Sequence, residues 1–200
     1  MTNKDRAIYW WRRGVEHGDP PCGLGSTWES TRNMSAFIER VIKTYSVRSV
    51  NDAGCGDYSL WMHAVDFGDA TYCGFDVNDE LIEQNRKAFP SVSFQAVDIT
   101  TTALPRADLI ICRDVFLHIP NNQVIQTMRH FVASGALYLM STTFPWITTN
   151  NEIDTPELGY GCRRLNLLLE PFSFEPPFEF IDEPPWRRQV GLWDLRKVGY

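Results

Sequence analysis

Short apolar runs alternate with amphipathic segments along most of the chain. Apolar runs bounded by turn residues predict strands at about 48–52, 71–76, 92–97, 108–112 and 136–141. Between them, apolar residues spaced three or four apart predict helices at about 28–45, 57–67 and 78–88, and after Pro120. Strands that alternate with helices are typical of an α/β fold, in which helices cover a parallel sheet.

Polar residues mark the expected helix ends. Ser26 or Thr27 can cap the helix over 28–45, and Asn78 can cap the helix that Pro90 stops. Residues 1–28 form an aromatic, Arg-rich lead before the first predicted strand. After residue 144 we expect a long connection with one short helix, and then strands near 177–181 and 190–195.

A glycine turn follows the first predicted strand. Asp52 ends this strand, and Gly54, Cys55 and Gly56 come directly after it. Glycine lacks Cβ, so the chain can turn sharply here and a ligand can approach the backbone closely. The helix expected from Asp57 would direct its free N–H groups at that ligand. The pattern predicts a nucleotide-type cofactor site.

Two acids indicate which cofactor binds. Asp76, followed by Val77, closes the second strand and can accept both hydroxyls of a ribose. Asp98 closes the third strand and can accept from the exocyclic amine of an adenine, while Ile99 packs on the ring. Ser59 stands where a dinucleotide fingerprint has Gly or Ala to pass a pyrophosphate. The motif therefore favours a nucleoside without pyrophosphate, S-adenosylmethionine.

These motifs, in this order, resemble those of the class I S-adenosylmethionine-dependent methyltransferases. The likeness extends from about Ser35 to Leu195, and a third glycine common in the family is replaced by Tyr58. It is carried by the segments Asp52–Gly56, Asp76, Asp98–Ile99, Ala107–Asp114 and Gly135–Met140. The turns Cys112–Pro120 and Ser141–Pro145 are similar to those of small bacterial members of the family, often met beside glycan-building genes.

The resemblance implies a fold and a domain organisation. The fold is a Rossmann-like sheet of seven strands in the order 3-2-1-4-5-7-6, with the last strand antiparallel and helices on both faces. Residues 1–200 would form a single methyltransferase domain, in which the lead and helix of residues 1–45 cover the site. The cofactor would be S-adenosyl-L-methionine.

Composition narrows the class of partner. With 19 Lys and Arg against 25 Asp and Glu, the chain has a formal net charge of −6. This disfavours a nucleic-acid substrate, which usually requires a basic surface. The five cysteines are odd in number and include no CxxC pair, so we expect free thiols in a reducing cytoplasm and no metal site. We expect no secretory signal and no membrane span.

Asp114 and His118 are the candidates for catalysis. Methyl transfer is an in-line displacement that benefits from alignment and a dry site. A hydroxyl nucleophile also needs a base, and histidine titrates near neutral pH. Alternatively, His118 pairs with Asp114 or caps the turn before Pro120. Arg113 is expected to line the cofactor or to neutralise a carboxylate.

The substrate side is less defined. Trp28 and Arg32 either close over the site as a lid or simply begin the helix, and Thr143 is a further candidate for substrate contact. The pairs Arg163–Arg164 and Arg187–Arg188 are interpreted as surface residues, with binding of an anionic substrate as the alternative.

The sequence therefore predicts a methyltransferase that acts on a small molecule or glycan unit, with oxygen as the expected acceptor atom. Three alternatives stay open: an NAD-linked oxidoreductase, a catalytically silent S-adenosylmethionine-binding protein, and a nucleic-acid methyltransferase. The sequence leaves the oligomeric state open.

Overall fold

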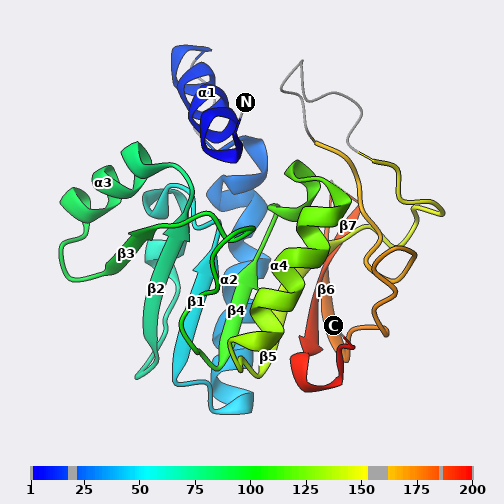
Figure 1. Cartoon of the computed structure of the whole chain (residues 1–200). Coiled ribbons are helices and arrows are strands. Elements are labelled where there is room, and N and C mark those ends of the chain that lie inside the picture. Colours follow the sequence, from blue (N-terminus) through cyan, green and yellow to red (C-terminus); the bar gives the residue numbers. More distant parts are fainter. Residues whose placement is uncertain (1, 18–21, 153–161, 185–186, 200) are drawn as a thin grey trace. The chain divides into compact units, whose positions relative to one another are not determined.

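The computed structural model describes residues 2–17, 22–152, 162–184 and 187–199. These residues form two compact units, 1–98 and 99–200, and each is described by itself. The strands have the order β3-β2-β1-β4-β5-β7-β6 (Figure 1). The strand order predicted for the sheet is confirmed.

The first unit contains three parallel strands. Its elements are α1 (Asn3–His17), α2 (Trp28–Tyr45), β1 (Ser49–Ala53), β2 (Thr71–Asp76), α3 (Asp79–Ala88) and β3 (Ser93–Ala96). Strand β2 pairs in parallel with β1 and β3, with Ala53 opposite Phe75 and Asp76 opposite Ala96. This register brings the carboxyl ends of the strands to one edge of the unit.

Local sequence signals explain two of its helices. The apolar face of α2 buries Met34, Ile38 and Val41 completely, and Ser46 ends the helix in the left-handed conformation. Helix α3 begins where predicted, because Oδ1 of Asn78 accepts a hydrogen bond from the N–H of Leu81.

The helix predicted over 57–67 is wrong. Two short 3-10 turns stand there, η2 (Tyr58–Leu60) and η3 (Met62–Ala64). The Asp57 carboxylate accepts from the N–H of Ser59, and Trp61 between the turns has φ −159° and ψ −34°. Helix α1, in contrast, was not predicted.

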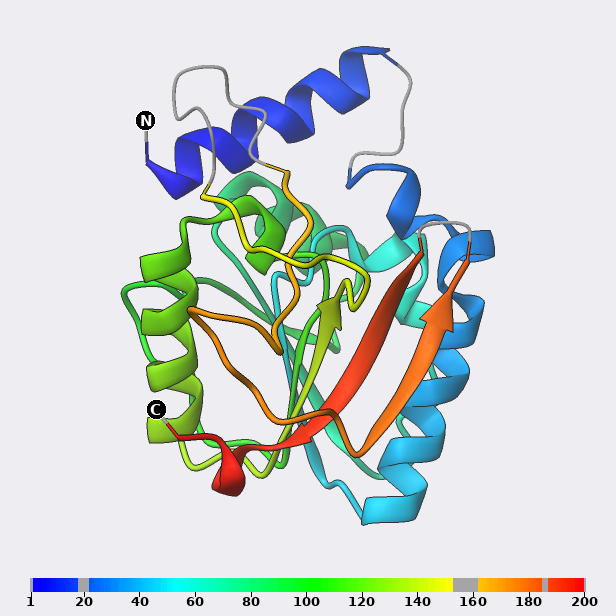
Figure 2. The same ribbon diagram turned by 90° about the vertical axis from the view of Figure 1, so that its right-hand side faces the viewer.

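The second unit contains a mixed set of strands. Its elements are β4 (Leu109–Cys112), η4 (Phe116–His118), α4 (Asn121–Ala133), β5 (Tyr138–Thr143), β6 (Glu179–Glu183), β7 (Arg188–Asp194) and η5 (Leu195–Lys197). Strand β5 is parallel to β4, whereas β7 is antiparallel to both β5 and β6. Figure 2 shows β6 and β7 side by side as a hairpin.

Most predictions for this unit are confirmed, with one difference. Helix α4 buries Val124, Met128 and Phe131, as its spacing indicated. The described part of the connection between β5 and β6 contains turns and no helix. The short helix expected there is therefore absent from residues 144–152 and 162–178, and residues 153–161 lie outside the described chain.

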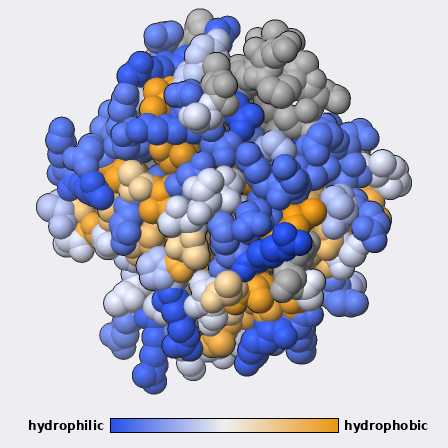
Figure 3. Space-filling model, viewed as in Figure 1, coloured by the Kyte–Doolittle hydropathy of each residue, from blue (hydrophilic) through white to orange (hydrophobic). Residues whose placement is uncertain are grey.

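The surface is mostly hydrophilic. On the face shown in Figure 3, hydrophobic residues form small patches between hydrophilic ones. Among the described residues, none of the helices has the length and hydropathy needed to cross a bilayer.

Candidate functional site

The glycine turn after β1 is fixed to the end of β2. Gly54 and Gly56 have φ of 87° and 57°, values that favour glycine. The N–H groups of Gly54 and Cys55 both donate to the carbonyl oxygen of Phe75, at 2.7 and 3.0 Å. The N–H of Gly56 donates to Oδ2 of Asp76 at 3.0 Å. The turn and the predicted ribose acid are thus joined directly.

Two residues that the sequence analysis missed hold the other side of this turn. Asn85 of α3 donates to the carbonyl of Gly56 at 2.8 Å and accepts from the N–H of Tyr58 at 3.2 Å. The Sγ atom of Cys22 accepts from the N–H of Asp57 at 3.2 Å. Burial raises the pKa of the Cys22 thiol to about 12, despite that hydrogen bond. Asn85 was detectable as a polar residue on the apolar face of α3, whereas Cys22 carried no signal.

All N–H groups of the turn are already used within the protein. Those of residues 54 to 58 donate to Phe75, Asp76, Cys22 and Asn85, and that of Ser59 donates to Asp57. The turn therefore presents no row of free donors, and no helix N-terminus follows it. The expectation that a helix would direct its N–H groups at the ligand is wrong.

Asp76 keeps acceptor capacity for a ligand. Oδ2 accepts from Gly56 and Oδ1 accepts from the N–H of Asn78 at 2.9 Å. Each carboxylate oxygen has a second lone pair, which can accept a hydroxyl. Burial raises the pKa of Asp76, although backbone N–H groups including that of Val77 act in the opposite direction. The geometry suits the two hydroxyls of a ribose.

The other acids of this unit have protein partners. Asp52 is buried and accepts from the hydroxyl of Tyr72 at 2.7 Å. Asp98 accepts from the side-chain amide of Asn3 in α1, at 3.2 Å. Helix α1 thereby contacts the acid that was predicted to bind adenine.

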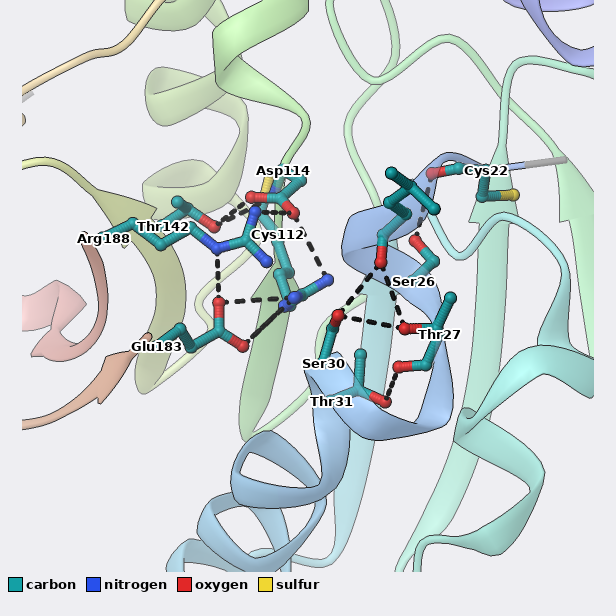
Figure 4. Close-up of polar contacts among 12 residues, drawn as sticks. Cys22, Ser26, Thr27, Ser30, Thr31, Cys112, Asp114, Thr142, Glu183 and Arg188 are labelled. Carbon is teal, nitrogen blue, oxygen red and sulfur yellow. Dashed lines mark hydrogen bonds and ion pairs between the residues drawn. The ribbon is translucent and has the colours of Figure 1, made fainter. Parts of the chain in front are cut away.

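Trp28 and Arg32 lie exposed on α2 in this unit. Figure 4 shows the hydroxyls at the start of this helix bonded to one another and to nearby backbone carbonyls. Thr31 donates to the carbonyl of Thr27 at 2.8 Å, and the hydroxyls of Thr27 and Ser30 are 3.0 Å apart. A role of Trp28 and Arg32 as a lid stays a prediction.

A buried ion cluster lies at the strand ends of the second unit. Arg113 follows β4 and contacts the Glu183 carboxylate with Nε and Nη2, at 3.2 and 3.1 Å. Arg188 contacts Glu183 at 2.5 Å and Oδ2 of Asp114 at 2.6 Å. Glu183 and Arg188 face each other across β6 and β7. Arg113 thus neutralises carboxylates, one of the two roles predicted for it.

Asp114 is held in one orientation. Its φ is 58°, and its N–H donates to Oγ1 of Thr142 while that hydroxyl donates back to Oδ1 at 2.9 Å. Figure 4 shows Asp114, Thr142, Glu183 and Arg188 pointing toward one another. The sequence analysis missed Thr142, Glu183 and Arg188 as members of this cluster, because they come from strands remote in the chain.

A small cavity opens beside this carboxylate. Its volume is about 10 Å³, room for about one water-sized group. Asp114, Ser141 and Thr142 provide its polar lining, and the remaining residues are apolar or sulfur-containing: Cys112, Phe116, Leu117, Phe144 and Leu165. The cavity thus combines a carboxylate with an apolar wall.

Three further predicted residues lie outside this lining. His118 is exposed on η4, and its backbone N–H donates to Val115. Thr143 is fully buried, and its hydroxyl accepts from the N–H of Leu167 at 3.0 Å, a structural contact. Ile99 is buried, and its carbonyl accepts from Nδ1 of His130.

Comparison with known proteins finds a matching family model and several solved structures of similar fold. Residues 50–135 match the family model described as a methyltransferase domain. Magnesium protoporphyrin IX methyltransferase from Synechocystis PCC 6803, with bound SAH, is 15% identical with a TM-score of 0.60, and the match covers 94% of each chain. N-methyltransferase NodS from Bradyrhizobium japonicum WM9, in complex with SAH, is 13% identical with a TM-score of 0.59 over 82% of this chain and 86% of that chain. No functionally curated protein matches the sequence.

The fold and the matched segment point in the same direction. The chain has the fold of these methyltransferases, and residues 50–135 match the methyltransferase-domain model. The resemblance found in the sequence is confirmed. Among the described residues, no group of three or more His, Cys, Asp or Glu side chains could hold a metal ion.

Proposed function

We propose that this protein transfers a methyl group from S-adenosylmethionine to an oxygen atom of a small molecule or glycan unit. The observation that carries the proposal is the turn at Gly54–Gly56, fixed to Asp76 within the matched domain. Structures of this fold with bound SAH or SAM support the cofactor, in agreement with the sequence prediction.

The cofactor's adenosine is assigned to the first unit. Asp76 accepts the ribose hydroxyls, and the backbone of Gly54–Gly56 passes beside the sugar and the methionine. Asp98, the last residue of this unit, then accepts from the adenine amine. Because Asn3 already bonds Asp98, binding of adenine requires this contact to rearrange or to be shared.

The same turn argues against an NAD-linked oxidoreductase. A pyrophosphate needs free N–H groups at a glycine turn and at the helix that follows it. Here the N–H groups of residues 54–59 all have protein acceptors, and 3-10 turns replace the helix. A nucleoside without phosphate makes no such demand.

The acceptor is assigned to the cavity beside Asp114. Asp114 and Thr142 provide polar groups that can orient a hydroxyl of the acceptor for attack on the methyl carbon. His118, which is exposed four residues after Asp114, is the proposed proton acceptor.

The direct test compares two cofactors by isothermal titration calorimetry. We expect S-adenosylhomocysteine to bind at micromolar concentration and NAD⁺ to show no saturable binding. Saturable binding of NAD⁺ without binding of S-adenosylhomocysteine would refute the proposal.

A second test concerns His118 in a protein supplied with its acceptor. His118→Ala is expected to lower kcat by about 100-fold, the usual contribution of a general base, with unchanged affinity for S-adenosylhomocysteine. His63→Ala, at an exposed position of the first unit, is the control. An unchanged kcat in His118→Ala would remove this residue from the mechanism.

A further inference from the structure

Two arginines lie against an exposed tryptophan in the second unit. The side chain of Trp146 is 40% exposed. The guanidinium carbons of Arg164 and Arg187 lie over its ring, 5.3 and 4.8 Å from the centre. The indole N–H donates to the backbone carbonyl of Arg187 at 2.6 Å, which fixes the ring relative to that residue. Each guanidinium is thereby held in place by cation–π contact.

These two arginines differ from the others near them. Arg113 and Arg188 pair with buried carboxylates, and Arg163 donates to the carbonyl of Ile119 at 2.6 Å. Within the described ranges, no acidic side chain pairs with Arg164 or Arg187, and both are exposed. Their donor groups are therefore accessible to a ligand.

The pair is adjacent to the cavity of the same unit. Phe144 lines the cavity, and its ring meets the Trp146 ring edge-on at 6.5 Å. Arg164 directly precedes Leu165, another lining residue. Arg187 directly precedes Arg188, which contacts the Asp114 carboxylate. The tryptophan that holds both arginines thus meets one lining residue directly, and Arg164 is bonded to another.

We propose that Arg164, Trp146 and Arg187 bind a carboxylate or phosphate group of the methyl acceptor. Planar guanidinium groups offer paired donors that match the oxygens of either anion. The acceptor is then an anionic molecule whose apolar part lies along Phe144 and whose hydroxyl reaches Asp114. Assignment of this ligand as the acceptor rests on the proposed function; the anion site itself does not.

The arrangement also revises the interpretation of the arginine pairs. The sequence analysis interpreted Arg163–Arg164 and Arg187–Arg188 as surface residues. Only one member of each pair is exposed, and the buried Arg188 belongs to the Asp114 cluster. The exposed members, Arg164 and Arg187, come together on Trp146, although 22 residues lie between them in the sequence.

The site can be tested with small anionic probes and no cofactor. Phenyl phosphate and benzoate are titrated while the indole N–H resonance of Trp146, assigned with Trp146→Phe, is followed by NMR. Phenol is the neutral counterpart of both probes. We expect at least one anion to shift the Trp146 indole resonance saturably, and its binding to weaken at higher salt. Phenol is expected to cause no saturable shift. The stronger probe identifies the anion as phosphate or carboxylate.

Matched variants locate the binding. The double variant Arg164→Gln with Arg187→Gln is expected to lose at least tenfold in affinity. Arg106→Gln with Arg129→Gln removes the same charge from exposed positions of the same unit and is expected to bind normally. Equal affinity in both double variants, or no saturable binding of either anion to the native protein, overturns the proposal.

Two controls separate this proposal from the proposed function. Thermal unfolding establishes that each variant is folded, and Arg164→Lys with Arg187→Lys provides a second variant that keeps the charge. The lysine double variant is expected to bind the anion probe more weakly than the native protein and more tightly than the glutamine double variant. Binding of S-adenosylhomocysteine, measured on the same samples, is expected to be unchanged. Native protein that binds S-adenosylhomocysteine and neither anion overturns the anion site, whereas native protein that binds an anion and no S-adenosylhomocysteine overturns the proposed function.

Discussion

At the scale of single residues, Asp76 links the glycine turn to the proposed cofactor. Its carboxylate is the acceptor for Gly56 and Asn78, and its remaining lone pairs can accept the hydroxyls of the proposed ribose. The position of this acid was predictable, because it closes a strand about twenty residues after Gly56. Its partners were not, since the turn's hydrogen bonds depend on how β1 and β2 pair.

Asp76→Ala is expected to weaken binding of S-adenosylhomocysteine by about 1–3 kcal/mol, the usual loss for an unpaired polar partner. Asp69→Ala, at an exposed position of the same unit, is the control. Calorimetry measures both. If Asp76→Ala binds as tightly as the native protein, the carboxylate does not hold the ribose.

The raised pKa of Asp76 gives this binding a pH dependence. Protonation removes acceptor capacity, so affinity for S-adenosylhomocysteine is expected to fall as the pH drops through a value above the ordinary 3.8. Stability of the free protein changes in the opposite sense. The folded state holds this proton more tightly than the unfolded state, so the contribution of Asp76 to stability decreases as pH rises through that window. Asp76→Asn should abolish both trends; their persistence in this variant would assign them to another group.

Gly56 is the second residue at which the turn can be tested. A Cβ at this position would lie 2.9 Å from Sγ of Cys22, and its φ of +57° is itself unfavourable for alanine. Gly56→Ala is expected to lower the free energy of unfolding by at least about 1 kcal/mol. Cys22→Ala in the same chain should recover part of this loss, as measured by urea unfolding. Strictly additive effects of the two changes would contradict the contact.

At the scale of elements, sequence prediction succeeded where the determining contacts are local. Helix α3 is marked by its own cap, Asn78, and α2 by a continuous apolar face. The helix expected at 57–67 failed because the Asp57 carboxylate bonds the N–H of Ser59 and Asn85 takes the N–H of Tyr58. Those bonds replace the first turn of a helix.

Helix α1 was missed for a different reason. None of its residues with a described side chain is buried, so packing of an apolar face does not define this helix. It is attached through polar contacts: Asn3 with Asp98, Lys4 with Asp79, and Arg12 with Glu80. Exposed ion pairs such as the last two contribute only about 0–1 kcal/mol each. That residues 1–45 cover the cofactor site stays a prediction.

The hairpin of β6 and β7 depends on a buried charge. Glu183 is the shared partner of Arg113 and Arg188, and its side chain is 1% exposed. Removing one partner of a buried ion cluster leaves the others uncompensated, at about 3–5 kcal/mol. Glu183→Gln is expected to destabilise the protein by this amount in urea unfolding. The control is Asp182→Asn, at the exposed position directly before Glu183. It should change the free energy of unfolding by less than about 1 kcal/mol, the usual contribution of an exposed ion pair. Equal effects of the two variants would contradict the account.

At the scale of the whole molecule, the strand order was predictable and the long-range side-chain pairs were not. The order followed from motifs that occur in a fixed sequence along the chain, and it is confirmed. Cys22 reaches Asp57 across 35 residues, and Arg188 reaches Asp114 across 74. Such pairs depend on how the elements pack, and a single sequence does not reveal that packing. The single-domain organisation stays a prediction.

The distribution of charge also appears only at this scale. A net charge of −6 disfavours nucleic acid in general, yet the second unit brings several arginines close to Asp114 and Trp146. Four of them have different partners: Arg113 and Arg188 bind carboxylates, while Arg164 and Arg187 lie on Trp146. A small anionic acceptor fits this arrangement, because the pair of guanidinium groups over Trp146 matches a single carboxylate or phosphate group.

The most direct test of the central claim is a crystal structure of the protein with bound S-adenosylhomocysteine. We expect the ribose hydroxyls within hydrogen-bond distance of the Asp76 carboxylate, and the sugar beside the backbone of Gly54–Gly56. A ligand bound elsewhere, with Asp76 contacting only Gly56 and Asn78, would contradict the account.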